Sequence, residues 1–241
     1  MSVAIPAEWR RTLKKNVVSR NAIFNGEEPC IRFKNKKPVS LIINKDIYSL
    51  FLKQVKTEPK CISRWAEYFP DYNFCWQEIF KLPFETVRCT MLQSLQYRIL
   101  HRIYPCNYWV AKWEQDTQPV CSHCEEIDTL DHHFFYCVRI NNLWKFFNTW
   151  WSNNIEKVDL SVTDILFGYM KKSHWGKALN YSILHGKLFI SKIVNSNYDP
   201  VSYSFLVQLK NALILEKCIS VKNDQLDIFN TNFGILYEAI G

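Results

Sequence analysis

The sequence predicts a mainly α protein: a helical domain with an embedded cluster of cysteines and histidines, preceded by a basic, partly irregular N-terminal arm. Three observations support this fold class. Beyond residue 60, apolar residues recur at spacings of three and four, which is the period of an amphipathic helix. Three of the nine Cys and three of the six His lie in one segment, CSHCEEIDTLDHHFFYC, from Cys121 to Cys137. Basic residues are concentrated in the first 60 positions.

The composition is that of a chain that buries a large core. Of its 241 residues, 48% are hydrophobic and 15% are aromatic, which excludes a disordered chain. The opening MSVAIPAEWRRTLKK becomes polar before any signal-like apolar region, and no apolar run approaches the roughly 18 residues of a membrane span. We therefore expect an intracellular protein, nuclear or cytoplasmic, without membrane contact, whose cysteines stay reduced.

Residues 1–60 are expected to form the basic linker or arm. They hold thirteen Lys or Arg and five Asp or Glu, a net charge of +8, whereas residues 61–241 carry −1 of the total of +7. A basic arm beside a nearly neutral body indicates contact with polyanions, and a solvated linker is the alternative interpretation. Within the arm we expect a short β-branched run and a helix from about Asp46.

PFETVRCTMLQSLQYRILHRIYP predicts the first long helix, with Pro83 before its start and Pro105 at its end. Its apolar face, at spacings of three, four and four, consists of Leu92, Leu95, Ile99 and Ile103. At about 100° per residue, the opposite face holds Ser94, Tyr97 and His101, with Arg98 beside them and Arg102 nearer the apolar edge.

Four more helices follow the cluster. VRINNLWKFFNTWW predicts a helix whose apolar face consists of Ile140, Leu143, Trp144, Phe147 and Trp151. Ser161 and Asp164 predict a capping box, and Gly168 predicts the end of that short helix. Asp199 and Pro200 predict the start of a helix that aligns Leu206, Leu209 and Leu213, and LDIFNTNFGILYEAI predicts the last helix.

Within the cluster, four residues have the spacing of ligands for one metal ion: Cys121, Cys124, His132 and Cys137. Three thiolates and an imidazole suit Zn²⁺, which takes four tetrahedral ligands. We expect one structural zinc ion in a Cys3His zinc knuckle, because four protein ligands leave no open position for a catalytic water. Residues 61–155 would then be a helical zinc-binding domain, with residues 156–241 a C-terminal helical region packed on it.

The spacing of the last two ligands constrains the local backbone. His132 and Cys137 are five residues apart, about 140° around an ideal helix, so an undistorted helix could not aim both at one ion. We expect the turn after His132 to be broken or tightened and the long helix to begin near Cys137. Asp128 and Asp131 are expected to cap a short helix that presents His132.

The ligand set has alternatives. His133 is the main rival of His132, His123 lies between the first two cysteines, and Cys106 is an outside candidate. A further alternative is that the segment binds no metal and consists of ordinary buried cysteines and surface histidines. Acidic residues around the cluster make it a poor phosphate clamp, so we expect the metal to stabilise the fold. These residues are Glu125, Glu126, Asp128 and Asp131.

Three stretches, SLQYRILHRIYPCNYWVAKW, the cluster and the Trp-rich helix after it, resemble the C-terminal zinc-binding domain of LINE-type (non-LTR) retrotransposon reverse transcriptases. In that family a Gln-aromatic-basic-Ile-Leu-His-Arg helix leads into Cys-x2-Cys, an acidic-Thr pair and His-Leu-Phe-x2-Cys. Here the motifs correspond to Gln96 to Arg102, to Cys121 and Cys124, to Asp128 and Thr129, and to His132, Phe134 and Cys137. The family's Leu is His133 in this chain, which leaves both histidines open as the ligand.

The resemblance implies a non-catalytic zinc-binding module that binds RNA or DNA. Joined to an upstream reverse transcriptase domain, it would support target-primed reverse transcription. The polymerase needs clustered Asp residues for two metal ions, and the chain contains no Asp-Asp pair, no P-loop and no hydrolase motif. We therefore expect no enzyme activity and no small-molecule substrate, and we interpret the chain as a C-terminal fragment or truncated copy. The candidate nucleic-acid contacts are Arg98, His101 and Arg102.

Two other interpretations stay open. A zinc-stabilised protein-interaction module would fit the acidic cluster and the neutral body of the chain. A retrotransposon remnant without a function of its own would also keep the ligand spacing for some time. The aromatic residues and the polar helix face also have interpretations without nucleic acid. Most Trp and Phe would then belong to the core, and the polar face of the helix would only be solvated.

Overall fold

The computed structural model describes residues 30–31, 37–38, 44–45, 48, 58–193 and 202–241. The chain forms two compact units, Met1–Thr57 and Glu58–Gly241. In the first unit, β1 (Cys30–Ile31) pairs antiparallel with β2 (Lys37–Pro38), Cys30 lies opposite Pro38, and residues 44, 45 and 48 are helical. Most of the predicted basic arm, including the start of its helix at Asp46, lies outside the described residues.

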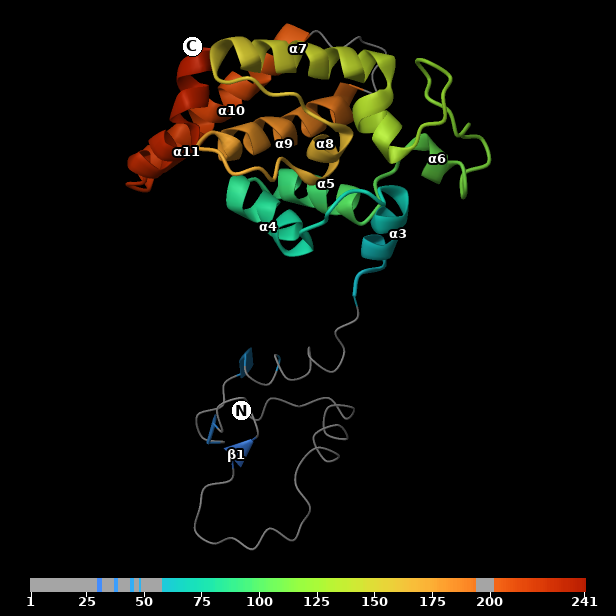
Figure 1. The fold of residues 1–241 in the computed structure, drawn as a ribbon, viewed down its shortest axis with the longest axis horizontal. Helices are drawn as coiled ribbons and strands as arrows, with labels where there is room; N and C mark the ends of the chain where they lie inside the picture. Colours follow the sequence, from blue (N-terminus) through green and yellow to red (C-terminus); the bar gives the residue numbers. More distant parts are fainter. Residues whose placement is uncertain (1–29, 32–36, 39–43, 46–47, 49–57, 194–201) are drawn as a thin grey trace, which may run out of the picture. The chain divides into compact units, whose positions relative to one another are not determined.

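The second unit is helical, which confirms the expected mainly α fold (Figure 1). Its first helices are α3 (Lys60–Tyr68), α4 (Trp76–Thr86), α5 (Thr90–Leu100) and the short α6 (Asn107–Val110). The metal-ligand segment contains the π-helix η2 (His132–Tyr136). The remaining helices are α7 (Val138–Asn154), α8 (Val162–Phe167), α9 (Gly176–Ile193), α10 (Ser202–Lys222) and α11 (Leu226–Ile240).

Helix α9 is the centre of this unit. It lies between α4 and α5 on one side and α7 and α10 on the other, with α11 also against it (Figure 1). Every residue from Ala178 to Ile190 is buried. A helix enclosed on all sides has no solvent face to which polar residues could be assigned, so even Lys187 on it is buried.

A group of aromatic rings fixes α3 and the start of α4 against the end of α8. Phe167 is fully buried at the centre of this group. Its ring centroid lies 5.0 Å from those of Trp65 and Phe74 and 5.7 Å from that of Tyr72. The indole N–H of Trp65 also donates to the carbonyl of Leu100 at 2.8 Å, which ties α3 to the end of α5.

Several helices have the faces or ends that the sequence predicts. The five predicted apolar residues of α7 are buried, and α11 spans the predicted segment. Ser161 and Asp164 form the predicted capping box at α8, and Gly168 ends that helix with φ +100. Leu206, Leu209 and Leu213 are buried on α10, whereas Asp199 and Pro200 lie outside the described residues.

The prediction for α5 was wrong at both of its ends. Leu92, Leu95 and Ile99 are buried as expected, but the helix ends at Leu100 and Arg102 adopts φ 56. This left-handed residue turns the chain away from the helix axis, and Ile103 is therefore 59% exposed instead of continuing the apolar face. Pro83 does not mark the start of α5, which begins at Thr90, but lies buried within α4.

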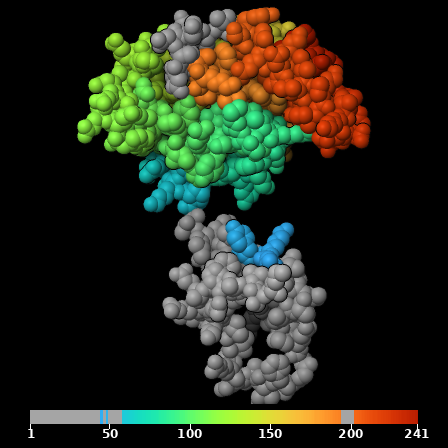
Figure 2. All heavy atoms as spheres, turned by 180° about the vertical axis from the view of Figure 1, so that it is seen from behind, coloured from blue at the N-terminus to red at the C-terminus, as the bar shows by residue number. Residues whose placement is uncertain are grey.

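The metal-ligand segment and the C-terminal helices lie at opposite sides of the second unit. Figure 2 shows the light-green segment around α6 at one end of this unit and the red helix α11 at the other end, as does the reverse view in Figure 1. Among the described residues, no helix combines the length and the apolar character needed to cross a membrane.

Candidate metal centre

A tight turn presents the first two cysteines. The amide of Glu125 donates to the carbonyl of Cys121 at 3.0 Å, and the amide of Cys121 donates to the carbonyl of Glu126 at 2.7 Å. Glu125 closes this turn with φ 62, in the left-handed region that non-glycine residues seldom occupy. The turn therefore brings the thiols of Cys121 and Cys124 to the same side of the chain.

A widened helical turn presents the other two ligands. The amide of Cys137 donates to the carbonyl of His132 at 2.9 Å, a five-residue hydrogen bond typical of a π-helix. The sequence predicted a broken or tightened turn, and the structure corrects this expectation because the turn is wider than an α-turn. The long helix α7 does begin next to Cys137, its N-cap residue.

The widened turn is also held from the following helix. In a π-turn the carbonyl groups lose their α-helical pairing, and a buried carbonyl needs another donor. The indole N–H of Trp144, on α7, donates to the carbonyl of Phe134 at 2.8 Å. Both side chains are buried, so this bond fixes the turn against α7 from inside the core.

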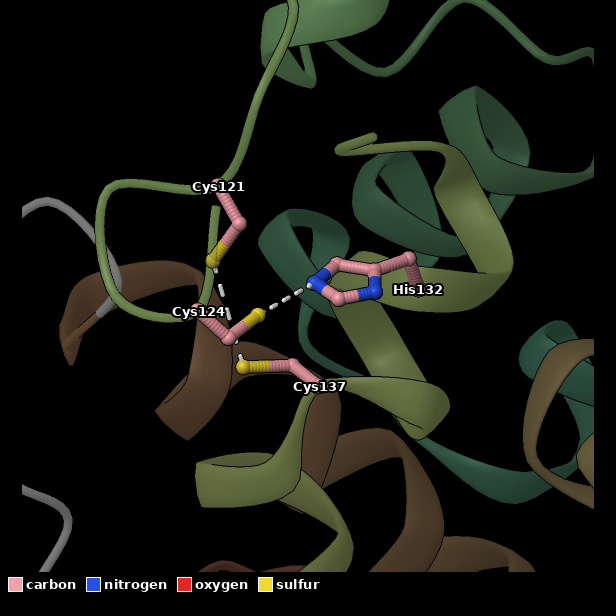
Figure 3. A group of neighbouring side chains, drawn as sticks. All are labelled: Cys121, Cys124, His132 and Cys137. Carbon is pink, nitrogen blue, oxygen red and sulfur yellow. Dashed lines mark hydrogen bonds between the residues drawn. The ribbon is translucent and has the colours of Figure 1, made fainter. Parts of the chain in front are cut away.

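The four predicted ligands converge on one point. Figure 3 shows the three thiols and the His132 ring pointing toward one another, and all four donor atoms lie within 4.8 Å of each other. The Sγ atoms of Cys121 and Cys137 are 4.0 Å apart, and Cys124 Sγ lies 3.3 Å from His132 Nε2. Tetrahedral zinc–sulfur and zinc–nitrogen bonds require about 3.8 Å and about 3.6 Å for these pairs. The group could therefore hold a metal ion without rearrangement of the backbone.

Without a cation between them, the buried thiols favour the protonated form. Burial raises the pKa of the Cys137 thiol to about 11, and the charges of Cys121 and Cys124 raise it further. The backbone amides of Ile140 and Arg139, at the start of α7, act in the opposite direction. Several thiolates this close repel each other unless a cation lies between them, and a metal ion is such a cation.

The surroundings of His132 favour its neutral imidazole. Burial lowers the pKa of His132 below its ordinary value, although Asp128 and Asp131 act to raise it. A neutral imidazole offers a nitrogen lone pair to a metal ion, which a protonated ring cannot do.

The structure separates the two neighbouring histidines. His133 turns away from the thiols: its Nε2 lies 3.2 Å from the Tyr104 hydroxyl, and its Nδ1 lies 3.1 Å from Asp128 Oδ1. Only His132 belongs to the converging group found among the described residues. His123 is exposed, and Cys106 is buried outside the group, where burial raises the pKa of its thiol to about 11.

Asp131 occupies the N-cap position of η2, but its side chain makes no capping hydrogen bond, so the predicted capping role of Asp128 and Asp131 was wrong. Asp128 accepts from the amide of Asn107 at 2.8 Å as well as facing His133, so it joins α6 to the ligand segment. Asp131 accepts from the Tyr68 hydroxyl at 2.8 Å, which joins this segment to α3. These buried carboxylates make long-range contacts that no local sequence pattern could reveal.

The three predicted nucleic-acid contacts lie at the end of α5 and are half-buried. The guanidinium of Arg102 stacks over the Trp65 ring, 4.7 Å from its centroid. His101 lies 4.2 Å from the ring of Tyr97, centroid to centroid, and burial lowers its pKa. Arg98 is near Tyr104, where its charge opposes the burial that raises the Tyr104 pKa. Their role in nucleic-acid binding stays a prediction.

Comparison with known proteins identifies no relative of this chain. No protein-family model matches the chain, and no curated protein is significantly similar to it in sequence.

Proposed function

We propose that this chain is a non-catalytic, zinc-stabilised module that binds nucleic acid, above all RNA. Joined to a reverse transcriptase domain, it would support target-primed reverse transcription. The observation that carries the proposal is the convergence of Cys121, Cys124, His132 and Cys137 at the spacing of the family that the sequence resembles. The ion in question is Zn²⁺, because three thiolates and one imidazole in a closed tetrahedral set suit this ion best.

The role of the ion in this proposal is structural. With four protein ligands no position remains for water or substrate, so the ion fixes the Cys121–Cys124 turn to the start of α7. Contacts with nucleic acid would then come from basic side chains elsewhere on the chain, whose net charge is +7.

Filter binding of the full chain to a structured RNA, at several salt concentrations, tests the proposal. Retention that weakens steeply as salt rises is the expected result, because phosphate contacts release counterions. The Cys137→Ser variant is expected to retain less RNA after losing its zinc.

Absence of RNA retention by the zinc-loaded chain, even at low salt, would contradict the proposed function. Isolation of a stoichiometric protein partner without RNA would favour the protein-interaction module instead.

A further inference from the structure

A second feature of the helical unit lies away from the metal ligands. A groove of about 740 Å³ is bounded by α4, by the connection between α8 and α9, and by the first turns of α9. Four lysines from these three segments line it: Lys81, Lys171, Lys172 and Lys177. Residues 61–241 carry a net charge of −1, so the groove concentrates positive charge on an otherwise nearly neutral part of the chain.

Among the described residues, these lysines have no ion-pair partner. Within the described part of the chain, none of the four has a carboxylate oxygen within 4.0 Å, although Glu78 and Glu85 line the same groove. Lys81, Lys171 and Lys172 are exposed, and Lys177 is half-buried. The ammonium groups of the three exposed lysines are thus available to an anion that enters from solvent, whereas Lys177 Nζ lies 6.0 Å from the centroid of the Phe233 ring.

The floor of the groove is fixed before any ligand arrives. The amide of Tyr169 donates to Asn180 Oδ1 at 2.7 Å, and Asn180 Nδ2 donates back to the carbonyl of Tyr169 at 2.9 Å. Gly168 packs so closely on α4 that an added Cβ would lie 2.5 Å from Leu82 Cδ1. A preformed site loses less conformational entropy on binding than a mobile loop.

The lining distinguishes between classes of ligand. Pockets for small molecules are mostly apolar and enclose their ligand, whereas six of the thirteen residues that line this groove are charged. Lysines act as point charges that contact phosphates without a fixed geometry, and an adjacent aromatic ring can stack on an unpaired base. The half-buried ring of Tyr169 lies in this groove, with Lys171 Nζ 5.8 Å from its centroid.

We propose that this groove binds the backbone of a single-stranded nucleic acid segment, with the lysines on its phosphates and Tyr169 against a base. The inference rests on the proposed nucleic-acid function and assigns it a surface other than the end of α5. Because lysines and a stacking ring distinguish few bases, the groove binds strands with little sequence preference.

The test compares the full-length zinc-loaded chain with two double variants of equal charge change. Lys171→Gln with Lys172→Gln removes two groove lysines, whereas Lys145→Gln with Lys157→Gln removes two exposed lysines elsewhere. Binding to a labelled oligouridine of about 20 nucleotides is measured between about 50 and 200 mM salt.

The groove variant is expected to bind on the order of tenfold more weakly at about 0.1 M salt. Its plot of log affinity against log salt should also be less steep, with the magnitude of the slope smaller by about 1.4. The affinity of the control variant should change by about twofold or less, because its lysines are outside the groove. Glu78→Gln with Glu85→Gln should tighten binding, since it removes negative charge from the lining.

Equal losses in the groove and control variants, with helical circular dichroism unchanged, would overturn the inference and leave the proposed function standing. No binding of RNA by the wild-type chain would overturn both. Displacement of the RNA by polyglutamate at equal charge concentration would overturn the assignment to nucleic acid and indicate an acidic peptide instead.

Discussion

At the scale of single residues, the adjacent histidines have different partners. His132 faces the thiols, while His133 is held by Tyr104 and Asp128. Two neighbours of the same type can be told apart only by tertiary contacts. Tyr104 is 29 residues from His133 in the sequence, so local spacing could not choose between the histidines.

The histidines provide the first prediction. His132→Asn should abolish retention of zinc, because it removes one of the four donors. His133→Asn should keep one zinc per chain while lowering the free energy of unfolding by about 1–3 kcal/mol, since buried Asp128 loses one of its partners and, among the described residues, keeps only the amide of Asn107. Native mass spectrometry and chemical denaturation measure the two effects. Zinc loss in His133→Asn alone would show that the ligand assignment is reversed.

A second residue of interest is Lys187, which is fully buried on α9. Its Nζ donates to Gln96 Oε1 at 2.6 Å and to the carbonyl of Leu166 at 3.2 Å, and in the described residues no carboxylate lies within 4.0 Å of it. An ammonium group has three donors to satisfy, whereas a neutral amine is satisfied here. Burial lowers the pKa of Lys187 to about 7.

This lysine makes stability depend on pH. Between pH values of about 7 and about 10.5, the unfolded chain binds a proton on Lys187 that the folded chain does not, so the stability cost of burying this group falls as the pH rises. From pH 7 to pH 9 we expect the contribution of Lys187 to the free energy of unfolding to increase by about 2 kcal/mol. Denaturant titrations at a series of pH values measure it.

Lys187→Met is the control, because its side chain has similar length and does not titrate. The difference in the free energy of unfolding between wild type and Lys187→Met should narrow or change sign as the pH rises through this range. Parallel stability curves for the two proteins would show that Lys187 is already charged in the folded state.

At the scale of helices, the close approach of α9 to α7 depends on Gly186. A Cβ added there would lie 2.5 Å from the Cη2 atom of Trp144, a buried and rigid indole. Gly234 on α11 differs, since only Asn230 Cβ, at 4.0 Å, lies near its added Cβ.

Gly186→Ala should therefore lower the free energy of unfolding by about 1–3 kcal/mol, as overpacking outweighs the gain in helix propensity. Gly234→Ala should raise it by about 0.5–1 kcal/mol, because helix propensity acts there without a clash. Thermal unfolding of both variants provides the comparison. If Gly186→Ala instead raised the free energy of unfolding, α7 and α9 could move apart without a loss of stability, and the prediction would be wrong.

The helices show where sequence patterns succeed and where they fail. Periodic apolar residues predicted the buried face of α7 because one side of that helix meets solvent. The same periodicity could not anticipate that Arg102 would turn the chain and leave Ile103 exposed, since this depends on the stacking of Arg102 on Trp65. It also could not anticipate buried Lys187, because α9 is enclosed by helices distant in sequence.

The candidate site was predictable to a similar extent. The ligand types and their spacing follow from thiolate and imidazole chemistry, which is local in sequence. The π-turn and the contacts of Asp128 and Asp131 depend on α3, α6 and α7, so they appear only in the folded chain.

At the scale of the whole molecule, the metal ligands belong to the main core. Cys121 and Cys137 are buried in the same apolar cluster that contains α7, α9 and α10. The candidate metal centre is therefore not an appendage that could unfold by itself. Loss of the ion should affect the packing of the helices around it.

Chelation of zinc from the full chain is thus expected to remove part of the helical circular dichroism signal and to lower Tm by about 10 °C or more. Cys121→Ser should reproduce the effect, whereas Cys218→Ser, at an exposed cysteine of α10, should not. Native mass spectrometry should find one zinc per wild-type chain. A metal-free protein with its full helical content would contradict this prediction.

The π-turn between His132 and Cys137 has a consequence for insertions and deletions. Loss of one residue there would restore ordinary α-helical spacing, but it would rotate α7 by about 100° and shift it by about 1.5 Å relative to the preceding segment. Trp144 would then leave both Phe134 and the surface of α9. The length of this stretch should consequently tolerate less change during evolution than the identity of its exposed residues, such as Tyr136.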